Sequence, residues 1–170
     1  MSANRPTRIY AGAAHSVMPT GHQALGGLYR FDPGHGNGEG TPLTAGLPDN
    51  VDVRFILVHP KDPDVIFVGT QDGPYRSRDG GEHWERLGFP DRDVIIWSLA
   101  IHPTRPNVMY AGAQPVALYR SEDGGDTWRR LAQVKSPEHC GSNFLSRLVR
   151  IGLQASRPDE IYLGLEVSGV

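Results

Sequence analysis

Twice along the chain the sequence runs Tyr-Arg-Ser-x-Asp-Gly-Gly-x-x-Trp, first at residues 75–84 and again at residues 119–128. An aspartate carboxylate accepts backbone N–H groups in tight turns, and glycine adopts the positive φ angles that such turns need. A tryptophan at the end of the stretch can cover the strands that the turn joins. The two stretches therefore predict two β-hairpins of the same construction.

The hairpins belong to a longer repeat. Val58-His59-Pro60 returns 43 residues later as Ile101-His102-Pro103, and Phe67-Val68-Gly69 returns as Tyr110-Ala111-Gly112. A period of about 40 to 50 residues with several β-type runs per unit is typical of a propeller blade. Each unit is predicted to hold four strands, near residues 52–59, 65–69, 74–77 and 83–87, and near 94–102, 108–112, 117–121 and 127–132.

The flanking segments read as incomplete copies of the same unit. Ile9 to Gly12 matches a second strand and Leu28 to Arg30 a third, while Glu160 to Gly164 matches another second strand. We expect one all-β domain over residues 1–170, with a degenerate blade (1–50), two complete blades (51–90 and 91–135) and a partial blade (136–170). This is a β-propeller of four-stranded antiparallel blades with an incomplete ring, part of a propeller of roughly six to eight blades. The alternative is a ring completed by a second chain in an oligomer.

Composition agrees with many short strands, because the 170 residues include 21 glycines and 14 prolines, and no long helical periodicity is present. The net charge of −2 argues against nucleic acid as a partner. The single cysteine, Cys140, excludes an internal disulfide, and no zinc-type spacing occurs, so neither metal nor cofactor is expected. With no signal sequence and no apolar run of roughly 20 residues, we expect no membrane span and a cytoplasmic location, or export if the N-terminus is incomplete.

The pattern Ser-x-Asp-x-Gly-x-x-Trp resembles the Asp-box, or BNR repeat, of sialidases, sortilin-type receptors, xyloglucan-degrading glycoside hydrolases and the photosystem II assembly propeller. The resemblance covers nearly the whole chain. In those families the motif lies at the blade periphery, away from the ligand site, which implies a structural role over catalysis or calcium binding. The residues concerned are Ser77, Asp79, Gly81 and Trp84, and Ser121, Asp123, Gly125 and Trp128.

Propellers bind ligands at the central funnel, where inner strands begin. The repeat places Arg54 and Trp97 at equivalent positions, with Arg150 one place further along its own strand. Arginine and tryptophan together suit a carboxylate, a sulfate or a sugar ring. A second row, in the loops between second and third strands, contains Gln71, Asp72, Gln114 and Glu166 and would suit carbohydrate or peptide. Surface charge, a core aromatic and loop solvation explain the same residues without a ligand.

Two functions remain open, and a binding or assembly scaffold for a protein or peptide is favoured over an enzyme. A glycoside hydrolase needs two carboxyl groups about 5 to 9.5 Å apart, or a tyrosine nucleophile with an arginine cluster in sialidases. Thr7-Arg8-Ile9-Tyr10 lacks the proline of the Arg-Ile-Pro typical of sialidases. The sequence around Asp52, Asp72 and Asp93 matches no catalytic motif of a glycoside hydrolase. His59 and His102 recur at the same place in the repeat, which suits a packing or turn role. The inserted loops contain four histidines without metal-site spacing: His15, His22, His35 and His139.

Overall fold

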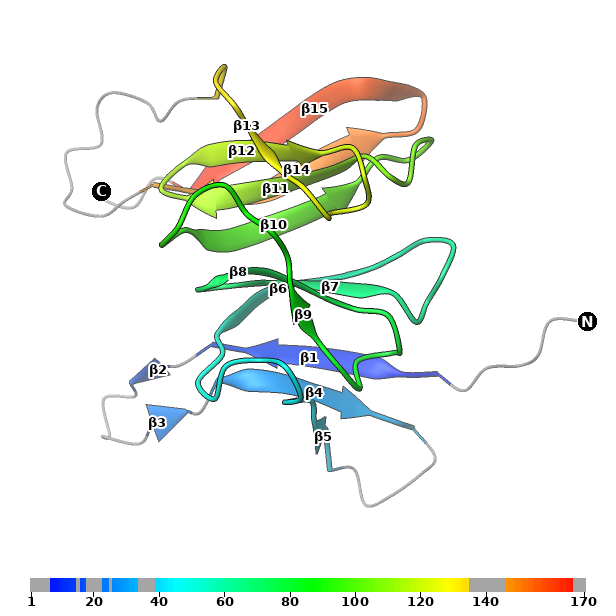
Figure 1. Cartoon of the computed structure of the whole chain (residues 1–170), viewed down its shortest axis with the longest axis vertical. Helices are drawn as coiled ribbons and strands as arrows, with labels where there is room; N and C mark the ends of the chain where they lie inside the picture. The colour runs from blue at the N-terminus through cyan, green and yellow to red at the C-terminus, as the bar shows by residue number, and fades with distance from the viewer. Residues whose placement is uncertain are drawn as a thin grey trace, which may run out of the picture.

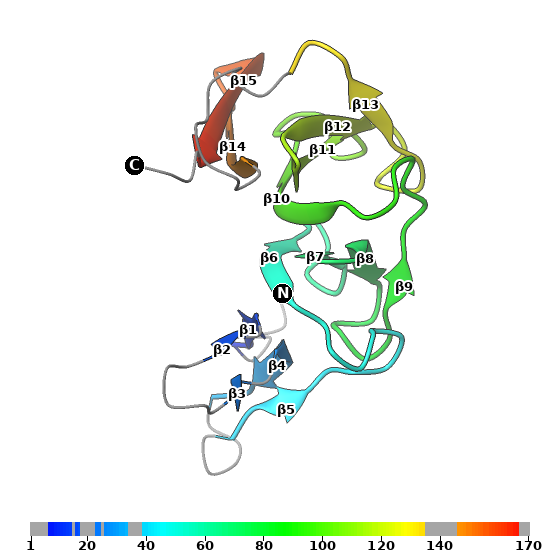
Figure 2. The ribbon, with the colours of Figure 1, turned by 90° about the vertical axis from the view of Figure 1, so that its left-hand side faces the viewer.

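A computed structural model describes residues 7–14, 16–17, 23–24, 26–33, 39–134 and 146–166. All regular elements in these ranges are β-strands, and all strand pairs are antiparallel. The sheets follow one another along the chain (Figure 1) and form an open arc with the first strands of the sheets on its concave side (Figure 2). The predicted all-β fold and incomplete propeller are therefore confirmed. No membrane-spanning helix occurs among the described residues.

Four sheets form the arc, and we call them blades 1 to 4. Blade 1 contains β1 (Ile9–Ala13), β4 (Gly27–Phe31) and β5 (Thr41–Pro42), and a small hairpin of β2 (Ser16–Val17) and β3 (Gln23–Ala24) lies where the sequence predicted a loop. Blade 2 contains β6 (Val53–Val58), β7 (Ile66–Thr70), β8 (Gly73–Ser77) and β9 (Glu85–Arg86). Blade 3 contains β10 (Ile95–Ile101), β11 (Met109–Gln114), β12 (Ala117–Ser121) and β13 (Arg129–Leu131), and blade 4 contains β14 (Arg147–Gln154) and β15 (Arg157–Glu166).

Glycines in the second strands let the blades approach closely. A Cβ added at Gly69 would lie 2.9 Å from Ile96 Cγ2 of the next blade, and one at Gly112 would lie 2.4 Å from Leu148 Cδ2. In β1 a Cβ added at Gly12 would lie 2.4 Å from Val53 Cγ1. Gly12 thus makes the same close approach to the next inner strand as Gly69 and Gly112 do. This likeness shows that β1 takes the place of a second strand, as the sequence predicted.

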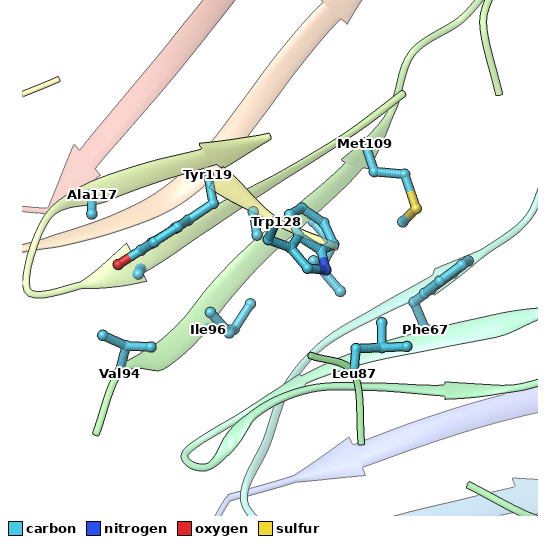
Figure 3. Packing of buried hydrophobic residues seen from close by; sticks show 11 residues of the cluster. Phe67, Leu87, Val94, Ile96, Met109, Ala117, Tyr119 and Trp128 are labelled. Carbon is cyan, nitrogen blue, oxygen red and sulfur yellow. The ribbon is translucent and has the colours of Figure 1, made fainter. Parts of the chain in front are cut away.

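The core lies between the blades, because each sheet packs against the next sheet along the arc. Between blades 2 and 3, Phe67 and Leu87 pack against Met109 and Ile96, and all four are at most 5% exposed. Figure 3 shows these side chains meeting across the gap between the two sheets. Blades 1 and 2 share a second cluster around Val53 and Ile66, and blades 3 and 4 a third around Tyr110 and Leu148. Apolar burial between successive sheets therefore holds the arc together.

The two predicted hairpins have the same hydrogen bonds. Ser77 Oγ donates to Asp79 Oδ1 (2.8 Å) and accepts from the N–H of Gly81 (2.8 Å), while Asp79 Oδ1 also accepts from the N–H of His83 (3.0 Å). Gly81 has a φ of 96°, and Trp84 Nε1 donates to its carbonyl at 2.9 Å. The second copy repeats these bonds with Ser121, Asp123, Gly125, Thr127 and Trp128.

Each hairpin also contacts the blade before it. The Arg76 side chain, 7% exposed, forms ion pairs with Glu85 of its own blade and Asp126 of the next, at 2.7 Å each. It donates as well to the carbonyl of Gly124. In blade 1, Tyr10 OH donates to the equivalent carbonyl, that of Gly80, at 2.9 Å. The hairpins thus link neighbouring blades through polar contacts.

Candidate binding site

Each inner strand of blades 2 to 4 contains a β-bulge at the same place. The register shifts between Val53 and Phe55, between Ile96 and Ser98, and between Leu148 and Arg150, which leaves one residue of each strand outside the ladder. The three extra residues are Arg54, Trp97 and Val149. A bulge redirects its side chain and bends the strand locally. The concave edge of the arc therefore has a row of three side chains, one per blade.

Two arginines contact the indole ring of Trp97. The guanidinium carbon of Arg54, from blade 2, lies 4.8 Å from the ring centroid, and that of Arg147, from blade 4, lies 4.3 Å from it. Because the two arginines come from the blades on either side of blade 3, the indole of Trp97 links three successive blades. Cation–π contacts of this kind each contribute about 0.5 to 2 kcal/mol, depending on solvent exposure.

Carboxylates and amides surround this stack. Arg54 Nη2 donates to Asp52 Oδ2 at 3.0 Å, and Arg147 Nη2 donates to Glu166 Oε1 at 2.6 Å. Trp97 Nε1 donates to Gln114 Oε1 at 2.9 Å. We call Arg54, Trp97, Gln114, Arg147 and Glu166 the rim cluster. The Nε atoms of both arginines are buried and have no hydrogen-bond partner in the described structure.

Gln71, Gln114 and Glu166 occupy the same register position at the ends of their second strands, but their contacts differ. Gln114 and Glu166 belong to the rim cluster. Gln71 instead holds the chain before β6, since it accepts from the N–H of Asp52 and donates to the carbonyl of Asn50. Asp72 accepts from Tyr75 OH and from Arg86, away from Trp97. Burial, together with the bond to Asp72, raises the pKa of Tyr75 to about 12.

Arg150 is not part of the rim cluster. It pairs with Gly164 in the ladder, next to the pair Ile151 and Leu163, whose side chains pack on blade 3. Because neighbouring residues of a strand point to opposite faces, Arg150 points away from blade 3, and it is exposed. Arg147 takes the place at the stack that the sequence had assigned to Arg150.

Arg147 was missed because the repeat gives no signal for it. Its equivalents in the inner strands are Asp52 and Ile95, so the residue type is not repeated. Arg147 is a ladder residue, paired with Glu166 two positions before the bulge, and its guanidinium lies over the Trp97 of the preceding blade. A search for basic residues within two positions of each bulge would have found it.

The carboxyl groups of the hairpins are unsuited to acid catalysis. The N–H and ring of His83 lower the pKa of Asp79 to about 2, and Thr127 does the same for Asp123. Arg76 lowers the pKa of Glu85. A glycosidase needs a general acid whose pKa is raised. The described residues include no group of three or more His, Cys, Asp or Glu placed to hold a metal ion, and His15, His22, His35 and His139 lie outside the described residues.

No protein-family model and no curated protein sequence matches the chain. Solved structures do match it. The GH74 xyloglucanase from Xanthomonas campestris is 22% identical with a TM-score of 0.65, over 95% of this chain and 26% of its own. A YCF48 bound to D1 peptide is 20% identical with a TM-score of 0.61, over 92% of this chain and 48% of its own.

The extracellular domain of a putative hybrid two-component system from B. thetaiotaomicron also matches, with 17% identity and a TM-score of 0.64, over 92% of this chain and 19% of its own. The chain therefore spans about half or less of the length of each of these proteins. At these identities the likeness concerns the fold and not the site. Together with the arc of antiparallel blades, it shows that the chain has the fold of part of a β-propeller.

Proposed function

We propose that the protein is a non-catalytic binding module. Its rim cluster binds a protein or peptide segment through the carboxylate groups of that segment. We further propose that its two hairpins are Asp-boxes with a structural role. The covered ring of Trp97 supports the binding proposal most strongly. A sugar ring stacks on an open aromatic face, and two guanidinium groups already lie over the indole ring of Trp97. The rim cluster can therefore offer a ligand the N–H edges of two guanidinium groups, those of Arg54 and Arg147.

Glu166 supports a carboxylate as the ligand group. Its side chain is 47% exposed, yet it is bound to Arg147 at 2.6 Å. The cluster thus already binds one carboxylate that is open to solvent, and an incoming carboxylate can take its place. The structural neighbours include a YCF48 bound to a peptide, which supports a peptide as the ligand of this fold.

The indole N–H of Trp97 reports binding at this site. We would label the tryptophans with ¹⁵N, assign the Trp97 signal with Trp97→Phe, and titrate the chain with tetraglutamate. We expect a saturable shift of the Trp97 signal that Arg147→Gln weakens, whereas the signals of Trp84 and Trp128 stay in place. A matched control is tetraglutamine. Equal shifts with both peptides would contradict the proposal.

Glu166→Gln should change the affinity for tetraglutamate in the opposite direction to Arg147→Gln. If Glu166 occupies the site of the ligand carboxylate, its neutralisation frees Arg147, and tetraglutamate should bind more tightly. We expect an increase of about tenfold, the equivalent of one charge-assisted hydrogen bond. Unchanged or weaker binding would show that Glu166 does not compete with the peptide.

The second candidate is a glycosidase, and the GH74 neighbours favour it. At the rim the carboxylates of Asp52 and Glu166 are both in ion pairs with arginines. Incubation with xyloglucan and measurement of new reducing ends distinguishes the two functions. Release of reducing ends that Glu166→Gln abolishes would replace the binding proposal with an enzymatic one.

A further inference from the structure

Both arginines of the rim cluster have N–H groups to spare. Nη2 of Arg54 donates to Asp52 and Nη2 of Arg147 donates to Glu166, and neither Nη1 atom has a hydrogen-bond partner in the part of the chain that the structure describes. A guanidinium group has five N–H donors in a planar fork. The side chains of Arg54 and Arg147 are 24% and 27% exposed, so solvent reaches both. Each arginine can therefore bind a further acceptor.

The two guanidinium groups are close enough for one short segment to reach both. Their carbons lie 4.8 and 4.3 Å from the same ring centroid, so the distance between the two carbons cannot exceed the sum of these values. In an extended peptide, side chains two residues apart lie on one face about 7 Å from each other, whereas those four residues apart are separated by about 13 Å. Neighbouring side chains point to opposite faces. The arginines therefore fit acidic side chains at positions i and i+2.

The rim already accommodates two carboxylates beside one indole. Asp52 Oδ2 lies 3.0 Å from Arg54 Nη2, and Glu166 Oε1 lies 2.6 Å from Arg147 Nη2. The two carboxylates differ in exposure, since the side chain of Asp52 is 16% exposed and that of Glu166 is 47% exposed. A ligand can thus displace Glu166 from Arg147, while Asp52 stays in place and Arg54 binds through its Nη1 edge.

We propose that the rim cluster selects an extended acidic segment with carboxylate side chains at two alternate positions, one bound by Arg147 in place of Glu166 and the other by Arg54. This inference rests on the proposed function and names the class of segment that the site recognises. Both contacts are charge-assisted hydrogen bonds, and the second forms within a complex that already exists. In an extended segment, a single acidic side chain or two neighbouring ones reach only one arginine.

The test uses the ¹⁵N-labelled full chain and three peptides with blocked ends, so that no terminal carboxylate takes part. Their sequences are Ala-Glu-Ala-Glu-Ala, Ala-Glu-Glu-Ala-Ala and Ala-Glu-Ala-Ala-Ala, and we call them the alternate, adjacent and single peptides. The titrations are followed at the indole N–H of Trp97. We expect the alternate peptide to bind about tenfold more tightly than the adjacent one, the equivalent of one charge-assisted hydrogen bond. The adjacent and single peptides should have similar affinities.

Two variants locate the second contact. Arg54→Gln removes it, so the alternate peptide should then bind only as tightly as the single peptide does. Arg150→Gln is the matched control, because it removes the same charge from an exposed position outside the rim cluster. The Arg150→Gln chain should keep the wild-type preference for the alternate peptide.

The outcomes separate this inference from the proposed function. If the alternate and adjacent peptides both shift the Trp97 signal with equal affinity, the inference is overturned and the proposed function stands. A preference for the alternate peptide that persists in Arg54→Gln also overturns the inference, since Arg54 then does not bind the second carboxylate. If neither these peptides nor tetraglutamate shift the Trp97 signal, the proposed function itself fails.

Discussion

The hydroxyl of Ser77 has two partners in its hairpin, Asp79 as acceptor and the N–H of Gly81 as donor. Ser77 is 1% exposed, so Ser77→Ala leaves the Gly81 N–H buried without a partner. A loss of this kind costs about 1 to 3 kcal/mol. Urea unfolding followed by circular dichroism should show this loss, and a similar one for Ser121→Ala. Arg78→Ala, at an exposed neighbouring position, is the control and should change the free energy of unfolding little. A Ser77→Ala chain as stable as the control would contradict the prediction.

The lowered pKa of Asp79 makes a prediction about acid stability. Its folded pKa of about 2 lies below the unfolded value, so the ionised form is favoured in the folded state. This contribution is complete above the unfolded pKa near 4 and is lost as the pH falls toward about 2. We expect Asp79→Asn to be less stable than the wild type at pH 6 and the difference to vanish near the folded pKa. A difference that is constant with pH would show that the charge is not its cause.

At the scale of the strand, the close approach of blades 3 and 4 depends on Gly112. An added Cβ would lie 2.3 Å from Ser98 Oγ, 2.4 Å from Leu148 Cδ2 and 2.9 Å from the Leu148 carbonyl. We expect Gly112→Ala to lower the free energy of unfolding by about 1 to 3 kcal/mol through overpacking. Gly152→Ala is the matched control in blade 4, because its Cβ would meet nothing closer than 3.4 Å. Equal stability of the two variants in chemical denaturation would refute this account.

The strands also show what the sequence could predict. The turn residues and the period of the repeat were enough to predict the blades, because Gly81 and Trp84 have identical equivalents in the second copy, Gly125 and Trp128. The rim cluster was only partly predictable: Arg54 and Trp97 were found by their register, Arg147 was not, and Arg150 points elsewhere. The reason is that the bulge reverses the direction of successive side chains, and the period alone does not reveal which residue a bulge displaces.

On the scale of the whole molecule, the contacts between the described strands link each blade to its neighbours in the arc, as in other repeat proteins. Blades 2 and 3 are covered on both faces, whereas blades 1 and 4 each have one open face, where Ile9 is 51% and Tyr162 53% exposed. We therefore expect a gradient in hydrogen exchange, with the slowest amides in β7 and β11 and faster ones in β1 and β15. Mass spectrometry of peptic fragments measures it. A single rate for all four blades would mean that the chain opens as one unit.

The bulges divide the inner strands into residues that stand outside the ladder and neighbouring residues that pack in the core. Arg54, Trp97 and Val149 stand outside the ladder, so their side chains can change without altering the pairing of the strands. A laboratory library can vary these three positions while the neighbouring Val53, Ile96 and Leu148, which are buried in the core, are kept. One scaffold of this kind can therefore diversify what it recognises while the pairing of its strands stays the same.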